Sequence, residues 1–334
     1  MQTVSIIIPC HNEEKHIEGC LRSLLNNGYP AEFLELLVVD GMSTDNTRTF
    51  VHALSEKYPQ IKCIDNERMK TPFALNLGIK HATGYFTLIA SAHSSFHPGY
   101  IETLVHKMHT LKADVVGGSM ETDIKNRTHT SVAIQRVLAH PLGVGNALFR
   151  TGVSEDTLVD TVPFGLYKTE LLKSVNGYDE RLIRNHDIEL SKRLKRLNTS
   201  IFLTPAASCV YYARETWGAL AKNNFNNGKW NLLTVYITKD FSSLSVRHFV
   251  PLLFVLSILL PLLGMVLYPA LGLLSALSFT MYSGAVIFAS SKMNRGETTF
   301  LHIFITFIVL HFAYGMGSIV GGVQLNKLIK NDLN

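Results

Sequence analysis

The stretch VSIIIPCHNEEKHIEGCLRSLL, residues 4–25, decides the fold class of this chain. Its first part is a short apolar, β-branched run that ends at Pro9, which predicts a buried strand over residues 3–9. Its second part has apolar side chains at helical spacing, which predicts a helix over residues 13–26. The polar residues between them form a loop, as in the βα units of α/β proteins.

The same alternation continues for about 120 residues. Further strands are predicted over residues 33–39, 60–65, 85–90 and 115–120, and helices over residues 44–58, 72–82 and 98–111. Nearly continuous apolar strands predict an α/β, Rossmann-like fold with a mostly parallel sheet and helices on both faces. Ligands of such sheets bind beyond the carboxyl ends of the strands. Polar residues gather at these ends, in segments 9–13, 40–43, 65–66 and 91–93.

Beyond residue 120 the pattern is looser. Glycines in and beside residues 136–151 predict a mobile loop there. Helices are predicted over residues 169–175 and 187–197, and a strand over residues 200–203. An amphipathic segment follows at residues 216–239, with Trp and Tyr among polar residues. It fits a helix on the membrane surface and an ordinary helix covering the domain equally well.

Charge is unevenly distributed along the 334 residues, which carry 31 Lys and Arg against 26 Asp and Glu. Residues 249–291 are 43 consecutive residues without Asp, Glu, Lys, Arg or His. About 20 apolar residues suffice to cross a bilayer, so this stretch argues against a wholly soluble protein. The apolar content excludes a disordered chain. A net charge of +5 without a basic run argues against a nucleic-acid binder.

Two membrane helices are predicted over residues 249–267 and 271–289, separated by residues 268–270. The 43 residues are too many for one helix, because a span of about 30 Å takes only about 20 residues at about 1.5 Å each. A helical hairpin is therefore expected.

Basic residues predict the orientation of this hairpin. Arg247 precedes it, and Lys292 and Arg295 follow it, whereas its turn is uncharged. The positive-inside rule then places residues 1–248 and 290–299 in the cytoplasm. We expect the inner (cytoplasmic) membrane, with the main domain facing the cytoplasm.

Residues 300–323 are a third apolar candidate. One crossing would place Lys327 and Lys330 outside, against the positive-inside rule, and a re-entrant hairpin is the alternative. The predicted domains are residues 1–240, with 215–240 as a possible interfacial helix, and an anchor over residues 241–334 with two to four hydrophobic helical segments.

Three ordered segments carry a family resemblance: residues 4–25, LLVVDGMSTDNT at residues 36–47, and ALNLGIKHATGYFTLIASAHSSFHPGYI at residues 74–101. Together they resemble an inverting GT-A glycosyltransferase of family 2, over about residues 1–235. The chain has no glycine fingerprint for NAD and no Walker A motif for ATP. The resemblance implies a nucleotide-sugar donor, taken as UDP-linked. The residues it assigns to the donor are Pro9, Asn12, Glu13, Asp40, Ser43, Asp65, Ser91 and His93.

The chain departs from this family at the end of the fourth strand. The family normally carries Asp-x-Asp there, which holds a divalent metal on the diphosphate, but this chain reads Ser91-Ala92-His93. Here it resembles an ExoA-like subgroup of bacterial exopolysaccharide (succinoglycan) glycosyltransferases, in which Asp-Ala-His is usual. His93 is the expected ligand of Mn²⁺ or Mg²⁺, and imidazole favours Mn²⁺.

The segment RNHDIE, residues 184–189, occupies the position where the family carries Glu-Asp at the start of a helix. The resemblance implies that Asp187 is the general base, which removes the proton of the acceptor hydroxyl. His186 replaces the Glu and would tune Asp187 or contact phosphate. Without the family, Asp187 is also explained as a first-turn acid favoured by the helix dipole.

The segment NNGKW, residues 226–230, lies where the family often has Gln-x-x-Arg-Trp. Asn226, Lys229 and Trp230 would then contact the acceptor or a phosphate. The alternative is an interfacial aromatic residue beside a lysine that reaches out to water.

The sequence thus predicts a membrane-associated glycosyltransferase that moves a sugar to a lipid-linked (polyprenyl phosphate type) or polysaccharide acceptor by inverting single displacement. Expected partners are the nucleotide-sugar, the acceptor, membrane lipids and other polysaccharide-assembly proteins, but no nucleic acid. The alternative is a degenerate partner subunit that binds nucleotide-sugar without turnover, because both carboxylates of Asp-x-Asp are missing.

Overall fold

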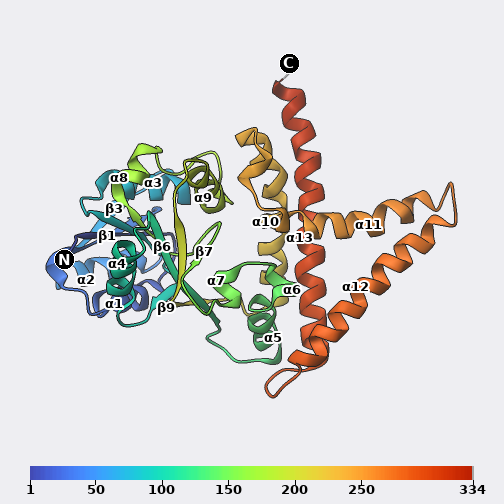
Figure 1. Ribbon diagram of the computed structural model, residues 1–334, viewed down its shortest axis with the longest axis horizontal. Helices are drawn as coiled ribbons and strands as arrows, with labels where there is room; N and C mark the ends of the chain where they lie inside the picture. The colour runs from blue at the N-terminus through green and yellow to red at the C-terminus, as the bar shows by residue number, and fades with distance from the viewer. Residues whose placement is uncertain (333–334) are drawn as a thin grey trace. The chain divides into compact units, whose positions relative to one another are not determined.

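The computed structural model describes the backbone of residues 1–332 and the side chains of residues 1–325. Contacts divide the chain into two compact units (Figure 1). The first contains Met1–Glu121 and Leu148–Tyr212, and the second contains Thr122–Ala147 and Ala213–Asn334. We predicted residues 213–240 as part of the domain of residues 1–240, but their contacts assign them to the same unit as the apolar helices.

The first unit is built on a nine-stranded mixed sheet, in the order β3-β2-β1-β4-β8-β6-β9-β5, with β7 beside β9. Four neighbouring strands are parallel: β1 (Val4–Cys10), β2 (Leu34–Asp40), β3 (Ile61–Asp65) and β4 (Phe86–Ile89). The others are β5 (Ser94–Phe96), β6 (Val115–Asp123), β7 (Thr157–Leu158), β8 (Leu166–Lys168) and β9 (Ile201–Tyr212). In register, Cys10 lies opposite Asp40, and Asp40 opposite Asp65, at the carboxyl edge.

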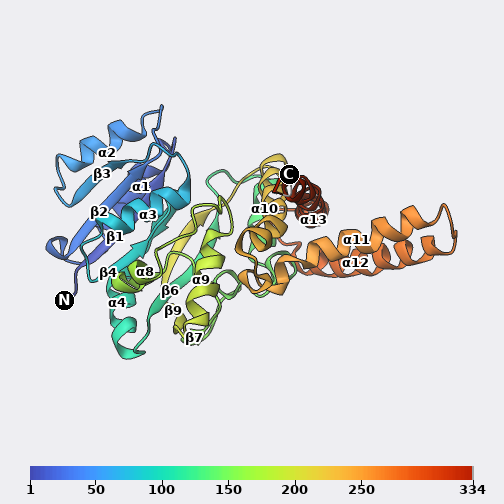
Figure 2. The ribbon, with the colours of Figure 1, turned by 90° about the horizontal axis from the view of Figure 1, so that it is seen from above.

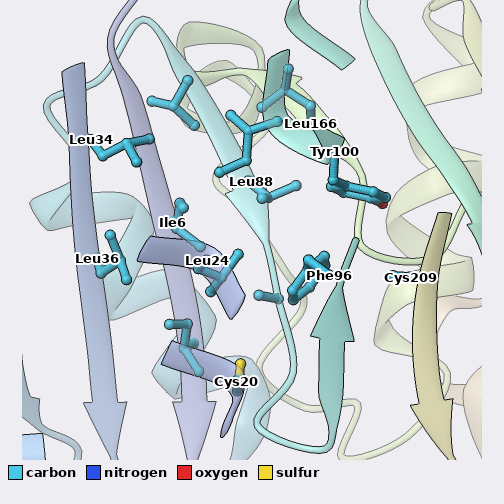
Figure 3. Packing of buried hydrophobic residues seen from close by; sticks show 14 of the residues in the cluster. Ile6, Cys20, Leu24, Leu34, Leu36, Leu88, Phe96, Tyr100, Leu166 and Cys209 are labelled. Carbon is cyan, nitrogen blue, oxygen red and sulfur yellow. The ribbon is translucent and has the colours of Figure 1, made fainter. Parts of the chain in front are cut away.

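Helices cover both faces of this sheet because alternate strand residues point to opposite sides. Ile6 and Ile8 pack with α1 (Ile17–Leu25), α2 (Thr47–Ser55) and α4 (Tyr100–Thr110). Figure 3 shows Ile6, Leu36 and Leu88 from three strands with Leu24 of α1. Ile7 packs on the other face, and the helices there are α3 (Thr71–His81), α8 (Thr169–Ser174) and α9 (His186–Arg196).

The predicted α/β fold is confirmed, but its second half differs in detail from the prediction. β8 pairs antiparallel with both β4 and β6, so the sheet is mixed after β4. β5, β7 and β8 were not predicted, because two or three residues are too few to show strand periodicity. The prediction of a loop over residues 136–151 was wrong, since α6 (Pro141–Val144) and α7 (Leu148–Thr151) are helical.

The second unit is helical. It contains α5 (His129–Leu138), α6, α10 (Trp217–Thr238), α11 (Val250–Gly264), α12 (Leu271–Met293) and α13 (Phe300–Asp332). The short helical turns η2 (Phe241–Ser243) and η3 (Val246–His248) connect α10 to α11, and η1 (Ala31–Phe33) precedes β2 in the first unit. Among the residues that the structure describes, three helical segments are long and apolar enough to cross a membrane: Val246–Gly264, Leu271–Met293 and Phe300–Leu325. The predicted series of apolar helices at the C-terminal end is therefore confirmed.

Candidate active site

Hydrogen bonds join the loops that follow β1 and β2 at the carboxyl edge of the sheet. Asn12 has a left-handed backbone, with φ of 56°. Its N–H donates to Ser43 Oγ at 2.8 Å, and its Oδ1 accepts the N–H of Thr44 at 2.8 Å. Two residues predicted to bind the donor are thus in direct contact, although 31 positions separate them in the sequence.

Asp40 is the buried centre of this edge, with a side chain only 1% exposed. Its Oδ1 accepts the hydroxyl of Ser43 at 2.5 Å, and its Oδ2 accepts the N–H of Ser43 at 3.0 Å. Arg48 donates to Asp40 Oδ2 at 3.0 Å and pairs with Asp65 Oδ1 at 2.8 Å. Asp65 is 55% exposed. Both predicted base-side carboxylates therefore share Arg48, which is not among the predicted donor residues.

Glu13 and His93 meet across the edge between β1 and β4. Glu13 Oε1 lies 2.7 Å from His93 Nε2. The ring of His16 lies edge-on to that of His93, with 4.7 Å between their centroids. One ligand atom from each of the three side chains lies within 4.8 Å of the others. The structure thus brings together two predicted residues and adds His16, which the Glu-x-x-His spacing at a helix start would have indicated.

Ser91 and Pro9 support this edge through the backbone. The carbonyl of Ser91 accepts the thiol of Cys20 at 3.3 Å, and its hydroxyl accepts the N–H of His93 at 3.4 Å. Pro9 lies within β1, in register with Val39. Burial, followed by the charge of Asp40, raises the pKa of the Cys10 thiol, so this thiol stays protonated at neutral pH.

Asp187 lies in the first turn of α9 and is exposed. Asn185 precedes the helix with a left-handed φ of 62°. Burial, with a smaller contribution from the charge of Asp187, raises the pKa of Tyr167. Burial, followed by the charges of Tyr167 and Asp187, raises the pKa of Tyr178, so two buried tyrosines lie within the field of this carboxylate.

His186 packs edge-on against Tyr178, with 5.7 Å between the ring centroids. Burial lowers the pKa of His186, which favours the neutral imidazole. Its buried Nδ1 has no hydrogen-bond partner among the side chains and backbone that the structure describes. Asn226, Lys229 and Trp230 lie in α10, in the second unit, whereas all the residues above belong to the first.

The side chains that follow β1 and β4 fit a divalent metal, although the Asp-x-Asp carboxylates are missing. Glu13, His16 and His93 together offer one carboxylate oxygen and two imidazole nitrogens. This donor set suits Mn²⁺ and the later first-row metals better than Mg²⁺, which prefers oxygen ligands.

The fold and this site define a GT-A glycosyltransferase. The family model for glycosyl transferase family 2 matches residues 5–175, and the chain belongs to this family. The predicted transferase class is confirmed: members of this family transfer a sugar from a nucleotide-sugar to a polysaccharide or lipid-linked acceptor.

Two curated relatives match at about 30% identity. A Methanococcus voltae enzyme, dolichyl N-acetyl-alpha-D-glucosaminyl phosphate 3-beta-D-2,3-diacetamido-2,3-dideoxy-beta-D-glucuronosyltransferase, is 31% identical over 237 residues, which cover 68% of this chain and 72% of that protein. Succinoglycan biosynthesis protein ExoA of Rhizobium meliloti is 30% identical over 226 residues, which cover 67% of each protein.

One solved structure resembles nearly the whole chain. It is the mannosyltransferase PcManGT from Pyrobaculum calidifontis in complex with GDP-Man and Mn²⁺. The TM-score is 0.59 at 17% identity, over 97% of this chain and 86% of that one. This likeness extends through the C-terminal helices and concerns the fold alone.

Proposed function

We propose that this protein transfers a sugar from a UDP-sugar to a lipid-linked acceptor at the cytoplasmic face of a membrane, with inversion at the anomeric carbon. The observation that carries the proposal is the polar edge of β1, β2 and β4, where Asn12, Ser43, Glu13 and His93 meet. Family membership and the apolar C-terminal helices support it. The M. voltae relative, whose name specifies a dolichyl phosphate-linked acceptor, supports a lipid acceptor here.

Asp187 is the proposed general base. Its carboxylate takes the proton of the acceptor hydroxyl while that oxygen bonds to the anomeric carbon and the bond from this carbon to the diphosphate oxygen breaks. The nucleoside diphosphate leaves from the opposite side, so the configuration inverts. The exposed position of Asp187 in the first turn of α9 leaves its carboxylate accessible to an acceptor.

The donor residues divide into contacting and supporting groups. Asn12, Ser43 and the half-exposed Asp65 are proposed to face the nucleoside. Asp40 is buried and already accepts four hydrogen bonds, two from Ser43, one from Arg48 and one from the Cys10 thiol, so its proposed role is to hold Ser43 and Arg48 in place. The segment that begins at Pro9 is proposed to contact the ribose of the nucleotide.

A divalent ion would stabilise the charge that develops on the leaving diphosphate. His93 and Ser91 are the proposed residues on the diphosphate side. His186 is proposed beside Asp187, where its neutral ring orients the base or contacts phosphate. Asn226, Lys229 and Trp230 are proposed to contact the acceptor and its phosphate.

The cytoplasmic orientation rests on charge. Arg247 precedes the apolar hairpin, and Lys292 and Arg295 follow it, so the positive-inside rule favours the inner membrane with residues 1–240 in the cytoplasm. The acceptor would then arrive from the bilayer and the donor from water. Contacts with other polysaccharide-assembly proteins would fit a pathway that builds a lipid-linked glycan.

An Asp187→Asn variant tests the proposal. General bases contribute about 10²–10⁴-fold to rate, so we expect transfer to fall by that factor while UDP binding, measured by calorimetry, is retained. The matched control is Glu170→Gln, since Glu170 is a first-turn acid of α8 whose side chain is 89% exposed. The assay follows UDP release from a panel of UDP-sugars in the presence of a membrane lipid extract. Full activity of Asp187→Asn would refute the assignment.

The missing carboxylates at Ser91 and His93 favour a second candidate, a partner subunit that binds nucleotide-sugar without turnover. The purified wild-type protein distinguishes the two. UDP binding without hydrolysis or transfer, across the donor panel and the lipid extract, would support the partner subunit. Release of UDP above the Asp187→Asn background would exclude it.

A further inference from the structure

We propose that Glu13, His16 and His93 form a preorganised three-ligand site that binds a transition-metal ion without nucleotide. Glu13 Oε1 and His93 Nε2 are 2.7 Å apart, and the His16 ring lies beside that of His93. A tetrahedral or octahedral ion with bonds of about 2.1 Å separates neighbouring ligand atoms by about 3.0–3.4 Å. The triad therefore needs only small side-chain shifts to surround an ion.

The backbone on both sides of this triad is fixed. The carbonyl of Glu13 accepts the N–H of His16 and of Ile17, each at 2.9 Å, which sets Glu13 and His16 on one face of the helix start. The N–H of Glu13 donates to Thr47 Oγ1 at 2.7 Å. The carbonyl of His93 accepts the N–H of Tyr212 in β9 at 3.3 Å. Each ligand therefore extends from an anchored segment.

The chemistry of the donors decides the class of ion. Two imidazoles and one carboxylate are typical ligands of Zn²⁺, Co²⁺, Fe²⁺ and Mn²⁺, whereas Mg²⁺ binds through carboxylates and keeps its waters. Three protein ligands also leave open positions for oxygen atoms of a bound molecule. That these positions take the donor diphosphate rests on the proposed function, but binding of the ion does not.

The test uses Co²⁺ as the probe on the untagged, full-length protein after treatment with chelator. We expect one equivalent of Co²⁺ to bind without nucleotide, with a visible absorption band that excess Mg²⁺ does not remove. The variants Glu13→Gln, His16→Gln and His93→Gln should each weaken binding by about tenfold or more. His52→Gln, an exposed histidine on α2, is the control and should bind Co²⁺ like the wild type.

Two outcomes would overturn the proposal. The first is that nucleotide-free wild-type protein binds no Co²⁺, which would leave only the polar contact between Glu13 and His93. This result needs no variant to fold. The second is that His16→Gln, folded by circular dichroism, binds Co²⁺ as tightly as wild type. Failure of the proposed function is distinguishable, because Co²⁺ would still bind while no UDP-sugar was turned over.

We also infer, from separate observations, that only the α11–α12 hairpin crosses the membrane and that α13 lies with α10 along its surface. Figure 1 shows α11 at a steep angle to α13, and in Figure 2 α13 is seen end-on beside the long hairpin. In the most apolar stretch of each segment, the buried share is 6% for the segment that contains α11 and 11% for α12, against 44% for α13. The hairpin protrudes, whereas α13 is covered by its neighbours.

Glycines bring α10 and α13 into backbone contact over much of their length. A Cβ placed at Gly317 would lie 2.0 Å from the Phe225 carbonyl oxygen, and one at Gly321 would lie 2.2 Å from that of Lys229. Earlier in both helices, the indole N–H of Trp217 donates to Thr306 Oγ1 at 2.8 Å. The two helices therefore run parallel and in contact.

This contact constrains whether α13 can cross the bilayer. If α13 crossed the bilayer, α10 would enter the hydrocarbon with it, carrying Lys222, Lys229 and five asparagines. Charged side chains at membrane depth are strongly unfavourable unless they are paired or lie in a water-filled cavity. An in-plane α13 leaves these side chains at the interface and also keeps Lys327 and Lys330, by sequence, on the same side as Arg295.

Reporter fusions to the full-length chain in bacterial cells test this topology. Green fluorescent protein after residue 334 should fluoresce, and alkaline phosphatase at the same position should be inactive, as expected for a cytoplasmic end. Phosphatase inserted at Pro269, in the hairpin turn, is the control and should be active. Active phosphatase after residue 334, with a reporter at Arg295 still cytoplasmic, would show that α13 crosses and overturn the inference.

Discussion

Arg48 offers a quantitative test of how the donor edge is held. We expect Arg48→Met to cost about 2 kcal/mol of local stability, because a hydrogen bond to a charged group contributes about 1.5–3 kcal/mol. Asp40, only 1% exposed, loses the guanidinium of Arg48 but keeps the hydrogen bonds from Ser43 and from the Cys10 thiol. Arg48 is 32% exposed, so water replaces part of the lost contact and the cost stays below the 3–5 kcal/mol of a fully buried pair.

The matched variant is Asp65→Asn, which breaks the exposed half of the same network. Asp65 is 55% exposed, so its pair with Arg48 is expected to contribute about 0–1 kcal/mol. Arg48→Met removes both contacts and Asp65→Asn weakens only the exposed one, so the difference between the two variants reports the buried contact.

Hydrogen exchange measures both variants on the full-length protein in detergent. The N–H of Ser43 donates to Asp40, and that of Thr44 donates to Asn12. At tenfold per 1.4 kcal/mol, peptides covering residues 40–48 should exchange about 30-fold faster in Arg48→Met. They should exchange less than about fivefold faster in Asp65→Asn. Equal acceleration in both variants, or none in Arg48→Met, would refute this account of the buried charge.

Three further predictions follow from other contacts. Glu35 is buried, which opposes its charge, but hydrogen bonds from Ser5, Thr83 and Lys62 outweigh this and lower its pKa. Its stabilising effect is therefore complete above the unfolded pKa of about 4.5 and is lost as the pH falls through the lower folded pKa. The difference in unfolding free energy between the wild type and Glu35→Gln should shrink only in acid. A difference that stays constant down to pH 3 would contradict this. In Gly228→Val the new Cβ would lie 1.9 Å from the Tyr314 carbonyl oxygen, so thermal unfolding should shift down by several degrees, whereas Gly218→Val, which meets no atom within 4 Å, should shift it less. Chelation with EDTA should abolish transfer and Mn²⁺ should restore it, and undiminished transfer in EDTA would remove the metal from the reaction.

Local sequence patterns predicted the βα half of the fold. β1, β2 and β3 are each followed by a helix, and β4 is followed by β5 and then α4. Periodicity located these first four strands, and the parallel rule placed their polar ends at one edge. Asn12, Glu13, Asp40 and Ser43 were predicted at this edge for that reason. β5, β7 and β8 are too short for such a signal, and their pairing depends on partners far away in the chain.

The pairings within the site were not readable from the sequence. Arg48 is one of many basic residues in the sequence, and only the neighbouring register of β2 and β3 shows that it joins Asp40 to Asp65. Similarly, the Glu-x-x-His spacing indicates His16 beside Glu13, but only the pairing of β4 with β1 brings His93 to them.

The sequence by itself determined that an α/β domain is joined to apolar helices, because hydrophobic periodicity and charge content are properties of the local chain. The resemblance of three segments to family 2 then implied a glycosyltransferase. Only the tertiary structure decided which carboxylates are buried and which face solvent, and which histidines share a site. It also decided that α10 accompanies α13. These outcomes depend on contacts between residues tens of positions apart, which no local pattern encodes.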